Sequence, residues 1–87
     1  MTKRALIKTY AHGKQPIVYV RWVDSTTTSG WGQTAADDHE PVTCETAGFL
    51  LKTRPSHVTI AQNRGPTKCG EVTSIPMVCV KSIRQLK

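Results

Sequence analysis

Cysteines, aromatic residues and long apolar runs are all scarce in this sequence of 87 residues. The three cysteines, Cys44, Cys69 and Cys79, form an odd and irregularly spaced set. Such a set argues against the disulfide scaffold of a small secreted domain. Zinc sites normally contain pairs of ligands that are close along the chain. No such pair occurs among these cysteines and His12, His39 and His57, so neither a metal nor another cofactor is expected.

No stretch of the chain approaches the ~20 consecutive apolar residues that a membrane-spanning helix requires. Near the N-terminus, a polar and basic start leads into three apolar residues before Lys8 interrupts them. This pattern does not resemble a secretory signal peptide. No membrane association is expected, and a reducing cytoplasm is the expected location.

Acidic residues are few: 6 Asp and Glu stand against 12 Lys and Arg, for a formal net charge of +6. Such a balance favours anionic partners such as nucleic acid, nucleotides or acidic protein surfaces. A solvated surface that keeps a small protein soluble would show the same balance. The basic residues are spread along the chain, so the sequence leaves both readings open.

What the sequence does contain is a succession of β-branched and alternating segments, which predicts one small all-β domain. The domain is expected over residues 17–87, and residues 1–16 form either an N-terminal arm or an extra strand. In the first strand, Val18, Val20 and Trp22 are expected to face the core. The outward set is still largely apolar, so part of that face is expected to be covered by the N-terminal segment or by another subunit of a homo-oligomer. Strands are predicted over residues 17–23, 42–52, 57–62, 71–75 and 82–86.

The C-terminal stretch predicts how this domain ends. Pro76 cannot donate a hydrogen bond to a β-ladder, so a strand should end there. Residues 77–80 are long enough for one 3₁₀ turn, and residues 82–86 then alternate as a closing strand. Gly48 inside the second long strand predicts a bulge or a sharp bend.

The motif Ile75-Pro76-x-x-x-Val80 resembles the segment that leads a Src-homology-three domain into its last strand. The order of the predicted strands is also similar to that of Src-homology-three-like and Sm-like small barrels. The resemblance implies a five-stranded barrel with a 3₁₀ turn before the last strand. The third strand begins with His57 and Val58 rather than paired tryptophans, so a groove for proline-rich peptides is not expected.

A second resemblance covers more of the chain and points to small uncharacterised proteins of tailed bacteriophages. It implies a phage-encoded accessory protein that works in the cytoplasm of a host cell, and it supplies no catalytic residues. The residues that carry it are Val20-x-Trp22-x-Asp24-Ser25, Gly30-Trp31, Cys44-x-x-x-Gly48-Phe49-Leu50-Leu51, Ile75-Pro76 and Ile83-x-x-Leu86.

No pattern in the sequence points to catalysis. No cysteine lies in a nucleophile elbow or at a predicted helix start. The hydroxyl-rich loop from Asp24 to Gly32 lacks the glycine and lysine spacing of a P-loop. The protein is therefore expected to be a binding module and not an enzyme.

Two binding hypotheses rest on different parts of the chain. The first is binding of nucleic acid or a nucleotide-like anion by basic residues together with aromatic ones, because phosphates attract Lys and Arg and bases stack on aromatic rings. Its candidate residues are Trp31, Tyr19, Arg21, Arg54, Arg64 and Lys68, with Lys14, Arg84 and Lys87 as further basic residues. The alternative is a protein-interaction module that modulates a host factor through Trp31 and the acidic loop residues Asp37, Asp38 and Glu40.

Overall fold

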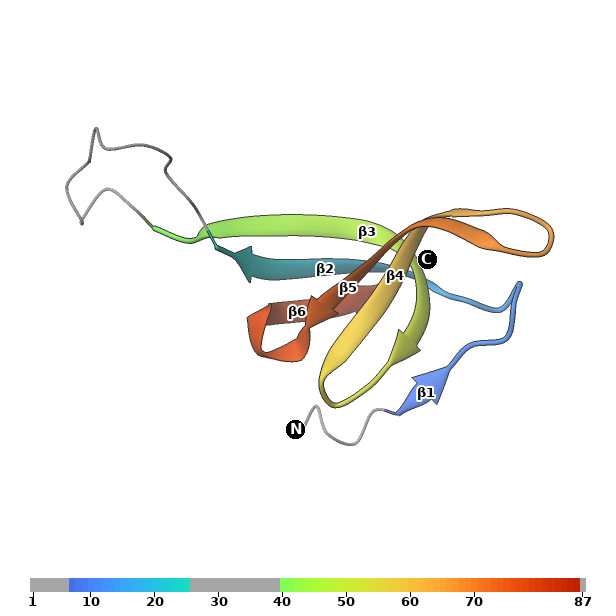
Figure 1. Cartoon of the computed structure of the whole chain (residues 1–87), viewed down its shortest axis with the longest axis horizontal. Coiled ribbons are helices and arrows are strands. Elements are labelled where there is room, and N and C mark those ends of the chain that lie inside the picture. The colour runs from blue at the N-terminus through green and yellow to red at the C-terminus, as the bar shows by residue number, and fades with distance from the viewer. Residues whose placement is uncertain (1–6, 26–39, 87) are drawn as a thin grey trace.

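The computed structural model describes residues 7–25 and 40–86 of the chain. Within these ranges the protein consists of β-strands and one 3₁₀ turn, which confirms the all-β prediction (Figure 1). The five longer strands are those that the sequence predicts, with differences only at their ends. In chain order the elements are β1 (Lys8–Thr9), β2 (Ile17–Asp24), β3 (Val42–Thr53), β4 (His57–Arg64), β5 (Cys69–Pro76), η3 (Met77–Cys79) and β6 (Val80–Gln85).

All the described strands belong to one antiparallel sheet. Its strand order is β5-β4-β3-β2-β6, and the short strand β1 pairs with β3. The two end strands, β5 and β6, do not pair with each other within the described chain, so the sheet is open. The structure thus differs from the predicted five-stranded closed barrel: β1 adds a sixth strand, and the sheet is not closed.

The strand β3 changes neighbours along its length. Its first part, from Val42 to Phe49, pairs with β2, and β4 pairs with it only from Phe49 onward. A Cβ atom at Gly48 would lie 2.5 Å from the carbonyl oxygen of Ala61 and 2.9 Å from Cγ2 of Ile60. Only glycine therefore permits β4 to approach β3 here. The predicted irregularity follows within three residues, as a register shift between Leu50 and Lys52.

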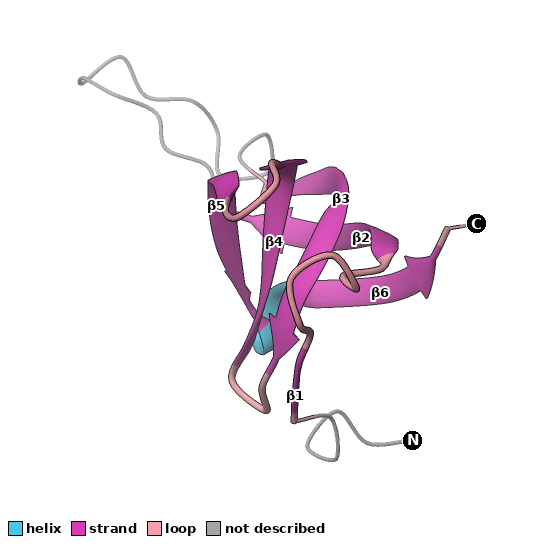
Figure 2. Cartoon of the chain, turned by 90° about the vertical axis from the view of Figure 1, so that its right-hand side faces the viewer, coloured by secondary structure: helices cyan, strands magenta, loops and turns pink. Residues whose placement is uncertain are grey.

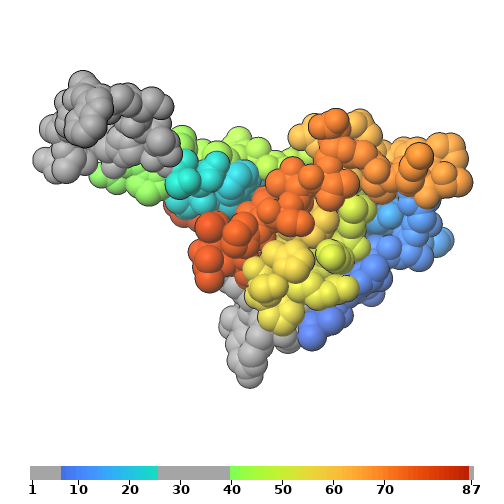
Figure 3. Space-filling model, in the orientation of Figure 1, coloured from blue at the N-terminus to red at the C-terminus, as the bar shows by residue number. Residues whose placement is uncertain are grey.

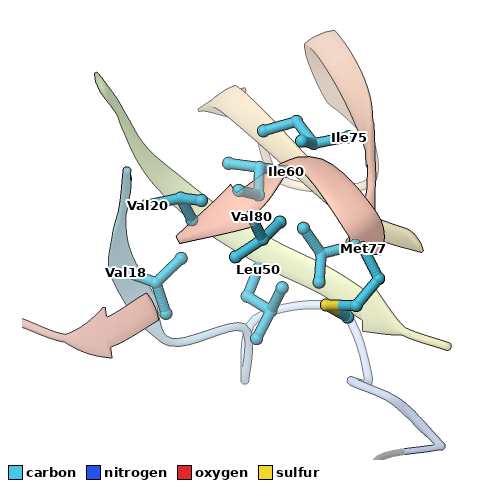
Figure 4. Packing of buried hydrophobic residues seen from close by; sticks show 8 residues of the cluster. Val18, Val20, Leu50, Ile60, Ile75, Met77 and Val80 are labelled. Carbon is cyan, nitrogen blue, oxygen red and sulfur yellow. The ribbon is translucent and has the colours of Figure 1, made fainter. Parts of the chain in front are cut away.

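The core lies on the inner face of the curved sheet (Figure 4). Val18 and Val20 are buried as the alternation predicts, whereas Trp22 is only half-buried and packs against the edge of the cluster. Each fully buried aliphatic side chain contributes roughly 1.5–3 kcal/mol relative to an exposed one. The buried cluster consists of Val18, Val20, Leu50, Val58, Ile60, Ile75, Met77 and Val80.

The C-terminal stretch contains the predicted 3₁₀ turn. Pro76 precedes η3, and the Met77 amide donates to the Ser56 carbonyl oxygen at 2.8 Å, which ties η3 to the β3–β4 turn (Figure 2). Met77 and Val80 are buried, but Val78 is 92% exposed. Val78 therefore lies outside the core, because a single 3₁₀ turn directs successive side chains to different sides.

The segment before β2 is held against the sheet by backbone and side-chain hydrogen bonds. The Tyr10 amide donates to the Leu51 carbonyl oxygen at 3.0 Å, beside the pairing of β1 with the end of β3. Gly13 has a φ of 90°, a conformation that favours glycine, and forms the turn into β2.

Among the described residues, no helix has the length and apolar character that crossing a lipid bilayer requires.

We expect Gly48→Ala to destabilise the protein by about 1–3 kcal/mol, since the added methyl group would push β4 away from β3. Gly70→Ala is the matched control, because a Cβ atom there meets nothing within 4 Å. Urea unfolding followed by circular dichroism measures both variants. Equal stability of Gly48→Ala and the wild type would show that the close approach of β4 is not required.

Candidate nucleic-acid interface

The outward face of β2 and β6 carries an aromatic ring between two arginines. Tyr19 lies directly opposite Arg84 on β6, and Arg21 lies opposite Ser82 in the next outward position of β2. The guanidinium carbon of Arg84 is 4.8 Å from the centre of the Tyr19 ring. This stacking contributes about 0.5–1 kcal/mol at an exposed site and holds the guanidinium group over the face. Arg21 and Arg84 are both exposed, so their charges face solvent.

A second arginine–aromatic pair lies diagonally across the same face. Phe49 is opposite Ile17, two residues from Tyr19 along β2, and the guanidinium carbon of Arg64 is 4.4 Å from the centre of the Phe49 ring. Diagonal neighbours on one face of an antiparallel pair lie about 7–8 Å apart. Ile17, which is 43% exposed, adds apolar surface between the two pairs. The face therefore alternates apolar and cationic groups.

Arg64 is fixed more firmly than Arg84. One of its terminal nitrogens donates to the backbone oxygen of Gln15 at 3.1 Å and to Gln15 Oε1 at 3.2 Å. Gln15 is buried and also accepts a hydrogen bond from the Gly13 amide at 2.8 Å. His12 bonds the Gly65 carbonyl oxygen at 2.8 Å. Hydrogen bonds thus join the turn before β2 to the β4–β5 turn. Arg64 extends from this junction.

One carboxylate lies within the basic face. Glu45 on β3 is opposite Arg21, and the Tyr19 hydroxyl donates to Glu45 Oε2 at 2.7 Å. This hydrogen bond, together with the negative charge of Glu45, raises the pKa of Tyr19 above its ordinary value of 10.0, although Arg21 and Arg84 oppose the shift. Tyr19 therefore remains a neutral, oriented ring at physiological pH.

The remaining predicted residues are distributed over several places. Arg54 joins the β3–β4 turn to β1, because its guanidinium group donates to the Lys8 carbonyl oxygen at 3.0 Å and to Thr9 Oγ1 at 2.7 Å. Lys68 is exposed in the β4–β5 turn. Glu40 is exposed just before β3. Trp31, Asp37 and Asp38 lie outside the described residues.

Phe49 was not predicted as a member of the site, and Arg84 was predicted only as one of the further basic residues, without its partner Tyr19. Their contacts cross between strands that are far apart in the sequence, so no local motif marks them. The alternation of β2 predicts that Tyr19 and Arg21 share one face, but only the register of β6 brings Arg84 over Tyr19. Over residues 7–25 and 40–86, no group of three metal-ligating side chains is found.

We expect Glu45→Gln to lower the pKa of Tyr19, because it weakens the hydrogen bond and removes the negative charge. In the wild type, the interaction stabilises the fold at pH values below 10.0 and is lost as the pH rises through the raised pKa of the folded state. An NMR titration of the tyrosine ring carbons measures the shift. Glu71→Gln makes the same change of charge on β5 and should leave Tyr19 unchanged; an equal shift in both variants would contradict the assigned cause.

The chain has no significant match among protein-family models, curated proteins or solved structures. What this face binds is therefore inferred from its own chemistry.

Proposed function

We propose that the protein is a non-enzymatic binding module that holds nucleic acid or a nucleotide-like anion on the outward face of β2 and β6. The observation that carries this proposal is the stacking of Arg84 on Tyr19 beside Arg21. Arginine pairs with phosphate oxygens through fixed, planar donors, and unpaired bases stack on aromatic rings and guanidinium planes. The face supplies both kinds of contact at one place.

The net charge of +6 supports the same proposal, because it draws an anionic chain toward the protein before specific contacts form. Lys68 and Arg64 lie at the neighbouring β4–β5 turn and would lengthen the path for phosphates. As part of the proposal, the open sheet is a variant of the Src-homology-three-like or Sm-like small barrel, in a phage-type accessory protein that acts in the cytoplasm of a host cell. Small barrels often bind nucleic acid, and this part of the proposal is an analogy of fold.

The alternative, a module that modulates a host factor through Trp31 and the acidic loop, is supported by the distribution of charge. Residues 22–51 contain no Lys or Arg and five of the six acidic residues. A surface of this sign repels phosphate and suits a basic partner. The two functions therefore need not exclude each other, because they occupy different parts of the chain.

We expect the protein to bind a labelled single-stranded oligonucleotide at low salt, with an affinity that falls steeply as salt rises. The logarithm of the affinity should fall by about 0.7 for each neutralised phosphate per tenfold increase in salt. The double variant Arg21→Ala, Arg84→Ala should bind more weakly and with a smaller salt slope. Fluorescence anisotropy at several salt concentrations measures both quantities.

The matched control removes the same charge elsewhere. In Lys8→Ala, Lys52→Ala, two lysines are lost from the paired segments of β1 and β3, five residues along β3 from the position opposite Tyr19. This control should retain most of the affinity and the salt slope. Absence of binding at low salt, or an equal loss in the control, would show that the outward face of β2 and β6 is not the binding surface.

A pair of substitutions at Tyr19 separates stacking from charge. Tyr19→Phe keeps the ring beneath Arg84 and should bind the oligonucleotide within about twofold of the wild type, whereas Tyr19→Ala should lose roughly 1–3 kcal/mol of binding. The salt slope should change little in either variant, because no cation is removed. The same anisotropy titration decides this, and equal affinities of the two variants would exclude a role for the ring.

A further inference from the structure

The first half of β3 has a neighbouring strand on one side only. Residues 42–48 pair with β2, and no other described strand pairs with them. Figure 1 shows β2 along one side of this segment, with no labelled strand along the other. Figure 3 shows atoms of β3 at the surface of the arm that β2 and β3 form. An open strand edge of this kind presents backbone donors and acceptors to a partner.

The hydrogen-bond pattern identifies the backbone groups at this edge. The Leu50 amide donates to the Pro16 carbonyl oxygen at 2.8 Å, in the same register as the β2–β3 pairing. Since residues of an antiparallel strand alternate between the two sides, the even-numbered residues of β3 bond to β2. The N–H and C=O groups of Thr43, Glu45 and Ala47 then point away from β2. The pairing of Phe49 with Ala61 of β4 continues the same odd-numbered series.

The edges that β5 and β6 form are protected in ways that this one is not. On β5, Glu71 has a φ of 54°, which interrupts the regular strand. On β6, Lys81 and Arg84 are exposed, and the register against β2 shifts between Arg21 and Trp22. Irregular backbone and basic side chains are the usual means of preventing strand addition. Residues 42–48 contain no proline, lysine or arginine.

The side chains beside the open edge indicate the chemistry of what would bind there. Glu45 is the only charged residue within residues 42–48, and it lies on the outward face between Thr43 and Ala47. The inward face offers Val42, which is 48% exposed, and the half-buried Cys44. A strand that fits has basic side chains outward and apolar side chains inward. A second copy would place its own Glu45 against this one in the register that uses all three odd residues, which is unfavourable.

We propose that the edge of residues 42–48 accepts an extended basic segment of a partner protein as an additional β-strand. Backbone hydrogen bonds to Thr43, Glu45 and Ala47 supply affinity, as in other cases of strand addition. The Glu45 carboxylate selects lysine or arginine on the outward face. The edge shares Glu45 with the arginine–tyrosine face, where this carboxylate accepts a hydrogen bond from the Tyr19 hydroxyl. Strand addition uses the backbone of β3, so it does not depend on the function of that face.

The test uses a synthetic peptide in which lysine and valine alternate, with blocked ends, titrated into the full chain and followed by NMR. Binding should slow the amide hydrogen exchange of Thr43, Glu45 and Ala47 more than that of residues outside the edge. Ala47→Pro removes one edge N–H without touching the β2–β3 ladder, and it should weaken binding at least about tenfold. Ala47→Thr keeps the N–H and should bind within about twofold of the wild type. Glu45→Gln should weaken binding about threefold.

A second measurement keeps the test decisive if Ala47→Pro does not fold. The same peptide with its alternate backbone nitrogens methylated, so that one edge of the peptide cannot donate, should not bind the wild-type protein. Equal binding of the methylated and unmethylated peptides would overturn the proposal, as would full affinity of a folded Ala47→Pro variant. Sedimentation of the free protein as a dimer, with these three amides already protected, would also overturn it, since a second copy would then occupy the edge.

Discussion

The close approach of β4 to β3 at Gly48 is the constraint on which the rest of the structure depends. The carbonyl oxygen of Ala61 occupies the space that a side chain would need at this position. At this point β4 crosses β3 and pairs only with its second half. The two halves of β3 therefore lie in different environments. Its second half closes over Val58 and Ile60, which are almost completely buried. Its first residues, from Val42 to Cys44, extend beyond the core beside the end of β2, whereas Val18 and Val20 of β2 remain buried.

This division separates two surfaces of opposite character. The body of the sheet presents Arg64 on Phe49 and Arg84 on Tyr19, so its outward face is cationic and aromatic. In the arm formed by β2 and β3, the sequence contains no basic residue between Arg21 and Lys52. Glu45 lies where the two surfaces meet, opposite Arg21 and bonded to Tyr19. The proposed anion and the proposed basic protein segment would therefore bind at different places.

Several features were predictable because they depend on local physics. The alternation in β2 fixes Val18 and Val20 as core residues, and β-branched residues favour the extended backbone they adopt. Pro76 followed by a short apolar stretch predicts the 3₁₀ turn, because proline cannot continue a β-ladder. Gly48 signals a special backbone position, although the sequence does not show what approaches it. The structural role of Arg54 was not predictable. An arginine in a turn indicates only a surface cation, and its hydrogen bond to β1 depends on the tertiary structure.

The sequence by itself determined the all-β class, the five long strands, the 3₁₀ turn and the basic net charge, since each follows from residue type and short-range spacing. Tertiary structure alone decided which arginine stacks on which ring, that the described strands form an open sheet, and which backbone groups of β3 have no neighbour among those strands. The physical reason is the strand register. Contacts between Tyr19 and Arg84, or between Phe49 and Arg64, join residues distant in sequence, and a shift of one residue would send each side chain to the opposite face.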